Sequence, residues 1–573
     1  MSFIGGYLNG GNSRVFGIFL LSALFITFAR VLSPFEIGTD QAVQLEAARR
    51  LADGLGLTTT NDAIHGSLDI SVAPAPRYLT QWPPAFSILV AGFLLTGLPL
   101  LVSLKIIYIV TTLVGWIGWA SIASRLVSEP IRIRTTALNV HYLLAAMLPI
   151  FTTPLWRGTD IFLWAGVPFF VLLLFKPLQQ DRSFMPFIFA GLLFGFLCAM
   201  RYASAFLGLA AVFIIFQVGY PRIKLMLKRL FFFSLPSLIV VLPLIAYLKK
   251  SPSGASALPA QFTATAGLVG GMYAKAKGIL NGAPILSNLI LGFPLLEQFL
   301  LRINSKPLNF AVGAVCLLII ISLPFIVLKS RASNAPRPQQ DLALSLSFLP
   351  LSLTLFLIVT RLLTDSALFR IRRYYEPLIL CGIFIFYEIA ARRSAHRIVK
   401  VSSLAIVALF TAYTLIFNTA LFFIPERRGQ LVQSVLAFTP ANSPRQNSTS
   451  KDIGYLGWGL YSWKESSRQK VKQLYEAHPD ALFFAQEYPL HIYDRIQGGP
   501  APGEKLIDYP GANYLKQAYT SRPIKVFWVM ASETQLTFID ESHLKLVHFD
   551  PVEDTKIYES DLPAGYKFLG DGR

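Results

Sequence analysis

Two aspartates lie near the ends of long apolar stretches, where a charged side chain is costly. Asp40 opens a polar segment after the first apolar stretch, and Asp160 opens a later apolar stretch. Two carboxylates at one membrane surface can deprotonate an acceptor hydroxyl and orient it. The structural alternative is that each aspartate caps a helix by accepting hydrogen bonds from free backbone N–H groups. For Asp40 taken alone, the cap is the better explanation.

Arginines beside tyrosines form a second group of candidates. Arg201 and Tyr202 lie between two short apolar stretches. The segment 369–377, FRIRRYYEP, contains Arg370, Arg372, Arg373 and Tyr374. A guanidinium group can bind two phosphate oxygens at once, so both groups are candidates for binding a phosphate. The alternative for Arg201 is an arginine that extends its charge into interfacial water, which is a common arrangement.

The elements that must position these side chains are membrane spans. Of the 573 residues, 54% are hydrophobic and 14% are charged, and the apolar residues come in long blocks. A soluble protein of this size needs more polar surface to cover its core. A helix needs about 20 mostly apolar residues to cross a membrane, which predicts about eleven spans. They lie near residues 15–33, 104–124, 135–153, 161–175, 184–200, 203–219, 230–248, 308–328, 342–360, 374–391 and 401–424.

Basic residues between the spans predict the orientation, because loops rich in Lys and Arg stay in the cytoplasm. The clearly basic connections lie within residues 125–134, 222–229, 329–337 and 392–400. All of them fall on the side of the N-terminus. We therefore expect a multi-pass protein of the plasma (inner) membrane with a cytoplasmic N-terminus. The first outer loop, 34–103, and the loop 249–307 then face outward, as do both aspartates and both arginine groups.

The outer face carries three further predictions. Arg370, Arg372 and Arg373 are predicted to lie outside, although basic residues normally stay in the cytoplasm. Their positive charge there favours an anionic ligand. The segment 83–98 is apolar but short and begins with two prolines, so we predict a re-entrant or interfacial helix. Counting it as a crossing would place every later basic loop outside. Residues 41–51 are predicted to form a helix whose apolar stripe rests on the membrane surface.

Other chemistry is not visible in the sequence. The net charge of +19 gathers in short loops between spans, so it indicates membrane topology and not a nucleic-acid partner. Cys198, Cys316 and Cys381 lie inside apolar stretches and are explained as small core residues. The histidines show no metal-ligand spacing. The sequence has no Walker-type glycine loop and no HExxH, CxxC or GxSxG pattern, so nothing supports an ATP-driven machine.

The composition changes near residue 425, which separates a membrane module, 1–424, from a soluble segment, 425–573. We predict a small α/β domain on the outer face, entered through a linker at 439–451 that is rich in Ser, Asn and Pro. Its expected elements are a helix at Lys464–Tyr475 and strands at Ala481–Gln486, Ile524–Met530 and Leu544–Phe549.

Several short patterns occur in a characteristic order along the first 390 residues or so. They are Asp40 followed by LADGLGLT, the triplet Trp82-Pro83-Pro84, Asp160 before an apolar stretch, GFLCAMRY ending in Arg201-Tyr202, and RRYYEP. This order resembles the GT-C superfamily of integral membrane glycosyltransferases. Within that superfamily the pattern resembles dolichyl-phosphate-mannose–protein mannosyltransferase-like and aminoarabinose-transferase-like enzymes, of glycosyltransferase families 39 and 83. Gln41 and Gln44 depart from the pattern, because many relatives have Glu and an aromatic residue there.

The resemblance implies an all-α polytopic GT-C fold that transfers a sugar from a polyprenyl-phosphate donor, with inversion. Asp40 would be the general base, Asp160 would organise the acceptor or a basic partner, and Arg201 with Tyr202 would bind the donor phosphate. The same phosphate-binding role falls to Arg370, Arg372 and Arg373. Glu46, Trp82 and Tyr374 are expected in the cleft between donor and acceptor. The acceptor, a glycan, lipid or protein, stays open, and so does a divalent cation, since some members use one.

Three other functions compete with the transferase. A flippase or transporter of lipid-linked saccharide predicts charges near the middle of the membrane and internal repeats, and neither is visible. A surface polysaccharide polymerase or ligase shares the basic outer loops but not the pattern from Asp40 to Trp82. A membrane scaffold with an external interaction domain leaves the outer arginines without a purpose.

Overall fold

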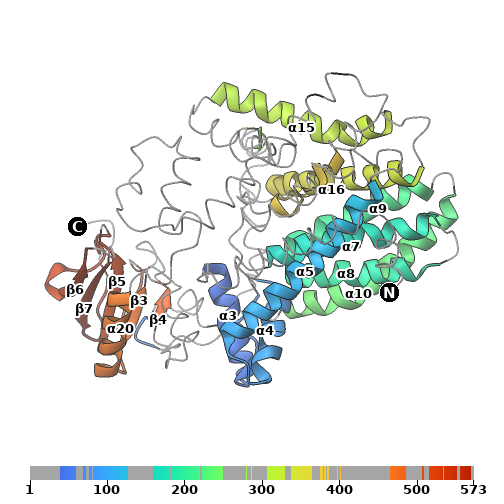
Figure 1. Cartoon of the computed structure of the whole chain (residues 1–573). Helices are drawn as coiled ribbons and strands as arrows, with labels where there is room; N and C mark the ends of the chain where they lie inside the picture. Colours follow the sequence, from blue (N-terminus) through green and yellow to red (C-terminus); the bar gives the residue numbers. More distant parts are fainter. Residues whose placement is uncertain are drawn as a thin grey trace.

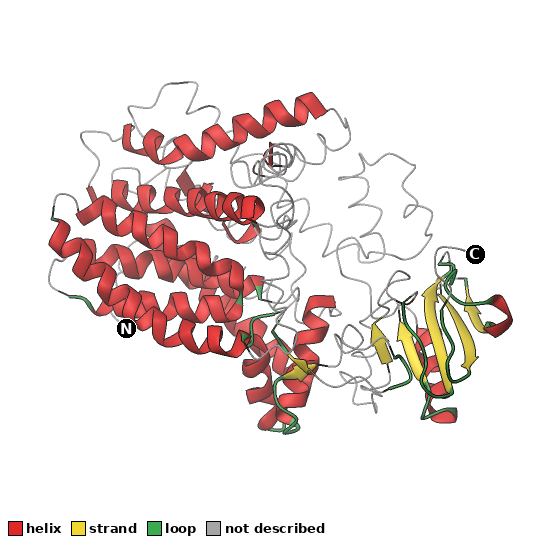
Figure 2. Ribbon diagram, turned by 180° about the vertical axis from the view of Figure 1, so that it is seen from behind, coloured by secondary structure: helices red, strands yellow, loops and turns green. Residues whose placement is uncertain are grey.

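The computed structural model combines a helix bundle with a separate β-sheet near the C-terminus (Figure 1). It describes residues 39–59, 69–72, 77–80, 82–126, 159–179, 183–219, 222–249, 306–329, 337–363, 465–485, 517–532, 534–551 and 555–568, with shorter pieces within 276–286, 375–401 and 506–515. Helices α3 and α4 lie between the bundle and the sheet in both views (Figures 1 and 2).

The bundle helices follow the long apolar blocks of the sequence. They are α5 (Leu100–Leu126), α7 (Asp160–Gln179), α8 (Met185–Met200), α9 (Phe206–Gly219), α10 (Ile223–Leu248), α15 (Lys306–Lys329) and α16 (Arg337–Leu363). Among the described residues, four windows are long and apolar enough to cross a membrane: Val102–Trp119, Ile223–Leu248, Pro307–Lys329 and Asp341–Leu362. These helices confirm a multi-pass membrane protein. They match the spans expected at 104–124, 230–248, 308–328 and 342–360.

The other expected spans have different outcomes. Those at 161–175, 184–200 and 203–219 correspond to α7, α8 and α9, which are apolar but shorter than a full crossing requires. Those at 15–33, 135–153 and 401–424 lie outside the described residues, apart from Val401, and 374–391 is described only in short pieces. The total number of spans therefore stays a prediction.

One face of α10 shows how these helices meet the lipid. Its large apolar side chains at steps of three or four residues are exposed, which places them in one stripe along the helix. They are Ile223, Leu227, Phe231, Leu235, Leu238, Leu242 and Ile245. Such a long exposed apolar stripe is unfavourable in water but matches the hydrocarbon of a membrane.

The opposite face of α10 packs closely on α8 because two glycines remove side chains from the contact. A Cβ added at Gly191 would lie 2.1 Å from the backbone oxygen of Phe233, and one at Gly195 would lie 2.7 Å from Cβ of Val240. Ser237 Oγ donates to the Phe233 oxygen at 2.7 Å and to the Gly191 oxygen at 3.2 Å. Small residues at this spacing let two membrane helices approach closely.

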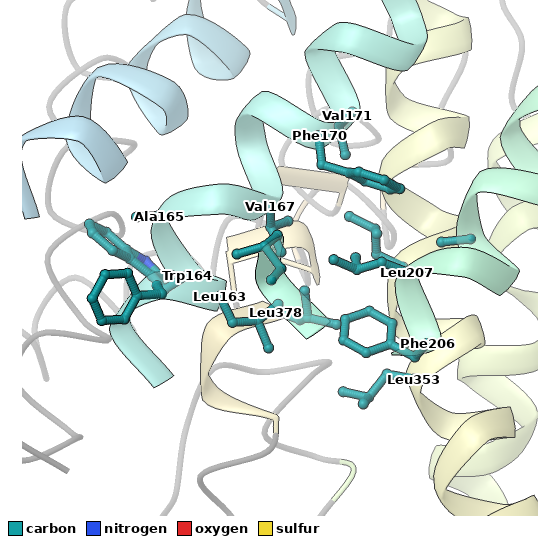
Figure 3. Close-up of a cluster of buried hydrophobic side chains, with 14 of the residues drawn as sticks. Leu163, Trp164, Ala165, Val167, Phe170, Val171, Phe206, Leu207, Leu353 and Leu378 are labelled. Atoms are coloured by element: carbon teal, nitrogen blue, oxygen red, sulfur yellow. The ribbon is translucent and has the colours of Figure 1, made fainter. Parts of the chain in front are cut away.

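The main core surrounds α7 (Figure 3). Its apolar side chains meet those of α9, α16 and the short helix η7 (Glu376–Leu378). The labelled members are Leu163, Trp164, Ala165, Val167, Phe170, Val171, Phe206, Leu207, Leu353 and Leu378. On another side, Trp119 of α5 donates from Nε1 to the Trp164 oxygen at 3.0 Å. Helix α7 is therefore held on several sides, which fixes its N-terminal residue, Asp160.

Two helices of the loop 34–103 pack against each other beside the bundle. They are α3 (Thr39–Ala52) and α4 (Ala85–Leu95), and Ser87 Oγ donates to the Gln44 backbone oxygen at 2.8 Å. With 11 residues, α4 is about 16 Å long and too short to cross a membrane, as expected for 83–98.

The prediction that the helix at 41–51 rests on the membrane surface was wrong. Its stripe residues Leu45 and Ala48 are buried, but so are the polar Gln41, Gln44 and Glu46. Protein therefore encloses the helix on both faces, and the stripe does not rest on a membrane surface.

The C-terminal residues form a mixed sheet in the order β4-β3-β5-β7-β6. Its strands are β3 (Leu482–Ala485), β4 (Leu506–Asp508), β5 (Ile524–Ala531), β6 (Lys545–Asp550) and β7 (Thr555–Leu562). Strand β3 runs parallel to β4 and β5, whereas β7 is antiparallel to β5 and β6. Helix α20 (Glu465–Ala477) covers one face through Val471, which packs with Phe483 and Phe527.

The helix and three of these strands were predicted from the sequence. Strands β4 and β7 were not, because β4 has three residues and β7 mixes polar with apolar residues. Ser560 of β7 is buried where Trp528 Nε1 donates to its Oγ at 3.0 Å, a pairing that no local pattern indicates. The linker expected at 439–451 lies outside the described residues.

The contact between α8 and α10 makes a prediction for Gly191→Ala. The added methyl group meets a backbone oxygen, so the helices must separate, and we expect a loss of about 1–3 kcal/mol in the free energy of unfolding. Thermal unfolding of the detergent-purified protein measures it. Gly92→Ala in α4 is the matched control, because nothing lies within 4 Å of its added Cβ. Equal effects of the two changes would contradict the packing argument.

Candidate active site

Asp160 and Arg201 form a buried ion pair. Arg201 Nη1 binds Asp160 Oδ1, and each side chain is only 9% exposed. Asp160 is the first residue of α7, and Arg201 directly follows the last residue of α8. The two sequence candidates therefore meet, 41 positions apart in the chain. Asp160 was expected to organise either the acceptor or a basic partner, and the structure shows it bound to a basic partner, Arg201.

Helix ends explain why this pair can sit in an apolar bundle. A carboxylate is favoured at the positive N-terminus of a helix, and a guanidinium at the negative C-terminus. Arg201 has an extended backbone, with φ −157° and ψ 117°, where α8 stops and the short helix η3 (Tyr202–Ala205) begins. This break between α8 and α9 exposes the end of α8 to the arginine. Each charge also neutralises the other, which offsets part of the cost of burial.

Tyr202 connects the ion pair to the loop 34–103. Its hydroxyl donates to the Thr80 backbone oxygen at 3.2 Å. Thr80 lies two residues before Trp82, which is half-buried and packs against the main core. The segment expected to line the donor–acceptor cleft is thus attached directly to the residue beside Arg201.

The same loop is bonded to α3 through Glu46. The Glu46 carboxylate accepts from Thr59 Oγ1 at 2.8 Å within the protein interior. Thr59 belongs to β1 (Thr58–Thr59), which pairs with β2 (Arg77–Tyr78) in antiparallel fashion. Glu46 was expected in the cleft, and the structure shows it holding the loop in place.

The Gly-x-Gly pattern is the turn that leads from α3 into β1. Gly54 and Gly56 have φ values of 78° and 76°, which favour glycine over other residues. Past the turn, Tyr247 of α10 donates from its hydroxyl to the Leu57 oxygen at 3.2 Å. Its ring also contacts the edge of Tyr78, with the two centroids 6.2 Å apart. The turn therefore directs the loop back onto the bundle.

The remaining candidates are only partly described. Asp40 lies in the first turn of α3, but the structure does not describe its side chain. Its closeness to Asp160 therefore stays a prediction. Arg370, Arg372, Arg373 and Tyr374 lie outside the described residues. The next residue, Tyr375, is fully buried.

Two buried amides next to Asp40 were not singled out as site residues. Gln41 and Gln44 are 1% and 3% exposed, and within the described residues their Oε1 atoms accept no hydrogen bond. Residues three apart share a helix face, so these amides are neighbours. Buried polar atoms are normally satisfied, which makes an unpartnered pair a candidate contact for a polar ligand. The sequence showed both glutamines but not their burial.

Metal ligation has no evident basis in the part of the chain that the structure describes. It contains no group of three or more His, Cys, Asp or Glu side chains able to hold a metal ion. The carboxylates of Asp160 and Glu46 bind Arg201 and Thr59 instead. Cys198, Cys316 and Cys381 are buried free thiols. The described residues therefore do not fit a divalent cation.

Comparison with known proteins finds similar structures at low sequence identity. A crystal structure of ArnT from Cupriavidus metallidurans bound to undecaprenyl phosphate has a TM-score of 0.40 and 14% identity, and the match covers 96% of this chain and 98% of that one. The apo structure of the same protein has a TM-score of 0.41 and 13% identity, with the same coverage. No protein-family model and no curated protein matches this sequence. Similarity at this level assigns no residue role and no activity.

The buried pair makes a prediction for stability. Arg201→Ala and Asp160→Asn each leave a buried charge without its ion-pair partner, so we expect losses of about 3–5 kcal/mol in the free energy of unfolding. Thermal unfolding in detergent measures this, and the double variant should lose less than the sum of the two. Additive losses would contradict the coupling.

The matched control for this experiment is an exposed ion pair. Arg49 Nε lies 3.6 Å from Asp53 Oδ2, and the two side chains are 45% and 52% exposed. Water already solvates both charges, so Arg49→Ala should cost less than about 1 kcal/mol.

Proposed function

We propose that this protein is a membrane glycosyltransferase that moves a sugar from a polyprenyl-phosphate donor to an acceptor hydroxyl, with inversion. The observation that supports it best is the buried Asp160–Arg201 pair, joined through Tyr202 to the loop that follows Asp40. This arrangement unites patterns that are far apart in the sequence, in the order typical of GT-C enzymes. It also holds a guanidinium at two helix ends, and we propose that this group binds the donor phosphate.

The proposed reaction needs one base and one group that stabilises the leaving phosphate. Asp40 takes the proton of the acceptor hydroxyl, whose oxygen then attacks the anomeric carbon of the sugar. The bond from that carbon to the phosphate oxygen breaks, and the polyprenyl phosphate leaves with the electron pair. Arg201 stabilises the charge that develops on this phosphate. Asp160 holds the guanidinium in a single orientation, and Arg370, Arg372 and Arg373 are proposed to assist.

The donor class agrees with the rest of the chain. A lipid-linked sugar is already activated, so the enzyme needs no nucleotide-binding loop. The exposed apolar stripe of α10 shows a surface suited to lipid, where a polyprenyl chain can remain while its head group reacts. We place the reaction at the outer face of the plasma membrane, with the N-terminus in the cytoplasm and residues 425–573 outside. Glycan, lipid and protein acceptors all fit this scheme.

The buried amides of Gln41 and Gln44 are suited to hydrogen bonds with a sugar. An amide oxygen accepts a hydrogen bond from a hydroxyl group, and Gln41 directly follows the proposed base. We propose that Gln41 and Gln44 bind sugar hydroxyls next to the reacting carbon. Their neutral side chains replace the acidic and aromatic residues of many relatives, which indicates a different sugar specificity.

A transfer assay tests the proposed reaction. Purified protein in liposomes is offered polyprenyl-phosphate-linked hexoses and pentoses, and consumption of the donor is measured. We expect Asp40→Asn to lower kcat by about 100-fold or more, because general-base catalysis contributes that much. Arg201→Lys, which keeps the charge but loses the planar fork, should slow transfer about 10-fold or more.

Asp53→Asn is the control, because Asp53 is an exposed aspartate just beyond α3. Full activity of Asp40→Asn would show that Asp40 is a helix cap. A donor that crosses the bilayer without losing its sugar would instead support the flippase.

Gln44→Met tests the proposed sugar contact. Methionine has a similar volume but no amide, so stability should stay within about 1 kcal/mol or rise. We expect the KM for the productive sugar donor to rise about 3- to 10-fold, which corresponds to one lost hydrogen bond. An unchanged KM would contradict the contact.

A further inference from the structure

A short piece of the first outer loop is built into the C-terminal domain. Ile70 is 3% exposed and belongs to the same apolar cluster as Trp528 and Phe538 of that domain. Its backbone N–H donates to the Tyr519 oxygen at 3.0 Å, and Asp69 forms a parallel bridge with Tyr519. The C-terminal core is therefore completed by a residue from the other end of the chain.

Polar side chains fasten this contact. The Asp69 carboxylate accepts from the backbone N–H of Ser521 at 3.1 Å, and from the N–H and hydroxyl of Ser71 at 3.0 and 2.6 Å. Arg522 Nε donates to the Ser71 backbone oxygen at 2.8 Å. We call these four residues, Asp69, Ser71, Ser521 and Arg522, the loop clamp. Their bonds join positions about 450 residues apart.

The Asp69 carboxylate of the clamp is in its charged form at neutral pH. Burial by itself raises the pKa of the Asp69 carboxyl, but hydrogen bonds from Ser521 and Ser71 outweigh burial and lower the pKa below its ordinary value. Because the pKa of Asp69 is lowered, its ionised carboxylate stabilises the contact fully at pH values above the ordinary carboxyl pKa of about 4. That stabilisation is lost only as the pH falls through the lowered value.

The other parts of the loop are bonded to the helix bundle and to α3. Thr59 binds Glu46 of α3, Leu57 accepts from Tyr247, and Thr80 accepts from Tyr202 beside Arg201. The clamp therefore stands between two sets of bundle contacts, at 57–59 and at 77–80. Thr80 follows Ser71 of the clamp by only nine positions in the chain.

We propose that the C-terminal domain positions the active site, and that the loop clamp is the contact through which it does so. Asp69 is then a positioning residue that acts through Thr80 and Tyr202 on Arg201. This inference rests on the proposed function for its catalytic consequence, but its structural part stands independently. The simpler alternative is that Ile70 only completes the core of the domain.

The test uses the full-length protein in detergent or liposomes and compares three variants. Asp69→Ala removes the acceptor of the clamp, and Asp69→Asn keeps an oxygen at that position. Asp540→Ala is the matched control, because the Asp540 carboxylate accepts the same kinds of bond in the same domain, from the N–H and hydroxyl of Ser542 at 2.9 and 2.8 Å, and Ser542 is not a clamp residue. Hydrogen exchange and transfer kinetics are measured for each.

If the domain positions the site, Asp69→Ala lowers exchange protection at 69–71 and also at 77–80 and 201–205, by about 10-fold or more. The kcat for sugar transfer then falls about 10- to 100-fold, since small displacements of a catalytic group have effects of this size. The donor KM changes little, Asp69→Asn restores most of the kcat, and Asp540→Ala behaves like wild type.

A covalent version of the clamp separates positioning from folding. The Oγ atoms of Ser71 and Ser521 lie 3.1 Å apart, so Ser71→Cys/Ser521→Cys brings two thiols within reach of a disulfide. Combined with Asp69→Ala, the oxidised pair should recover protection at 77–80 and the kcat, and reduction should abolish both.

Two results would overturn the proposal. One is lost protection at 69–71 with unchanged protection at 77–80 and 201–205, which leaves only the core-completing role. The other is an unchanged kcat in a variant whose clamp has opened. If the wild type transfers no sugar, the proposed function fails, while the exchange data alone still decide whether the clamp positions the site.

Discussion

A guanidinium and a carboxylate inside an apolar helix bundle must stay together, because either charge alone is strongly destabilising there. Arg201 and Asp160 meet this constraint at the break between α8 and α9 and at the N-terminus of α7. Their pairing fixes how these helix ends lie relative to each other. The close packing that glycines permit, at Gly191 against α10 and around α7, keeps the ends from separating.

The loop 34–103 is organised around this pair. It contacts the bundle through the hydroxyl groups of Tyr202 and Tyr247, and the C-terminal sheet through Asp69 and Ser71. The two bonds to the bundle end on backbone oxygens of the loop, so they do not depend on the side chains at those positions. The contact with the C-terminal sheet does depend on the side chains of Asp69 and Ser71.

Much of the architecture was predictable because it depends on local composition. Long apolar blocks such as 230–248 and 308–328 must be helices in lipid, where every backbone polar group needs a partner within its own segment. The strands at 481–486 and 524–530 followed from short apolar runs. Strand β7 was missed because two of its buried residues, Thr555 and Ser560, are polar, and its place depends on the neighbouring strands.

The sequence by itself determined the apolar helices of the bundle, several strands near the C-terminus and the candidates Asp160 and Arg201, since hydropathy and charge are local properties. Only the tertiary structure decided which residues meet. It paired Arg201 with Asp160 and buried Gln41 and Gln44 on a helix whose sequence looked amphipathic. It also packed Ile70 against a sheet whose strands lie more than 400 residues further along the chain. Contacts of this kind depend on how distant elements pack, and no pattern within one segment encodes them.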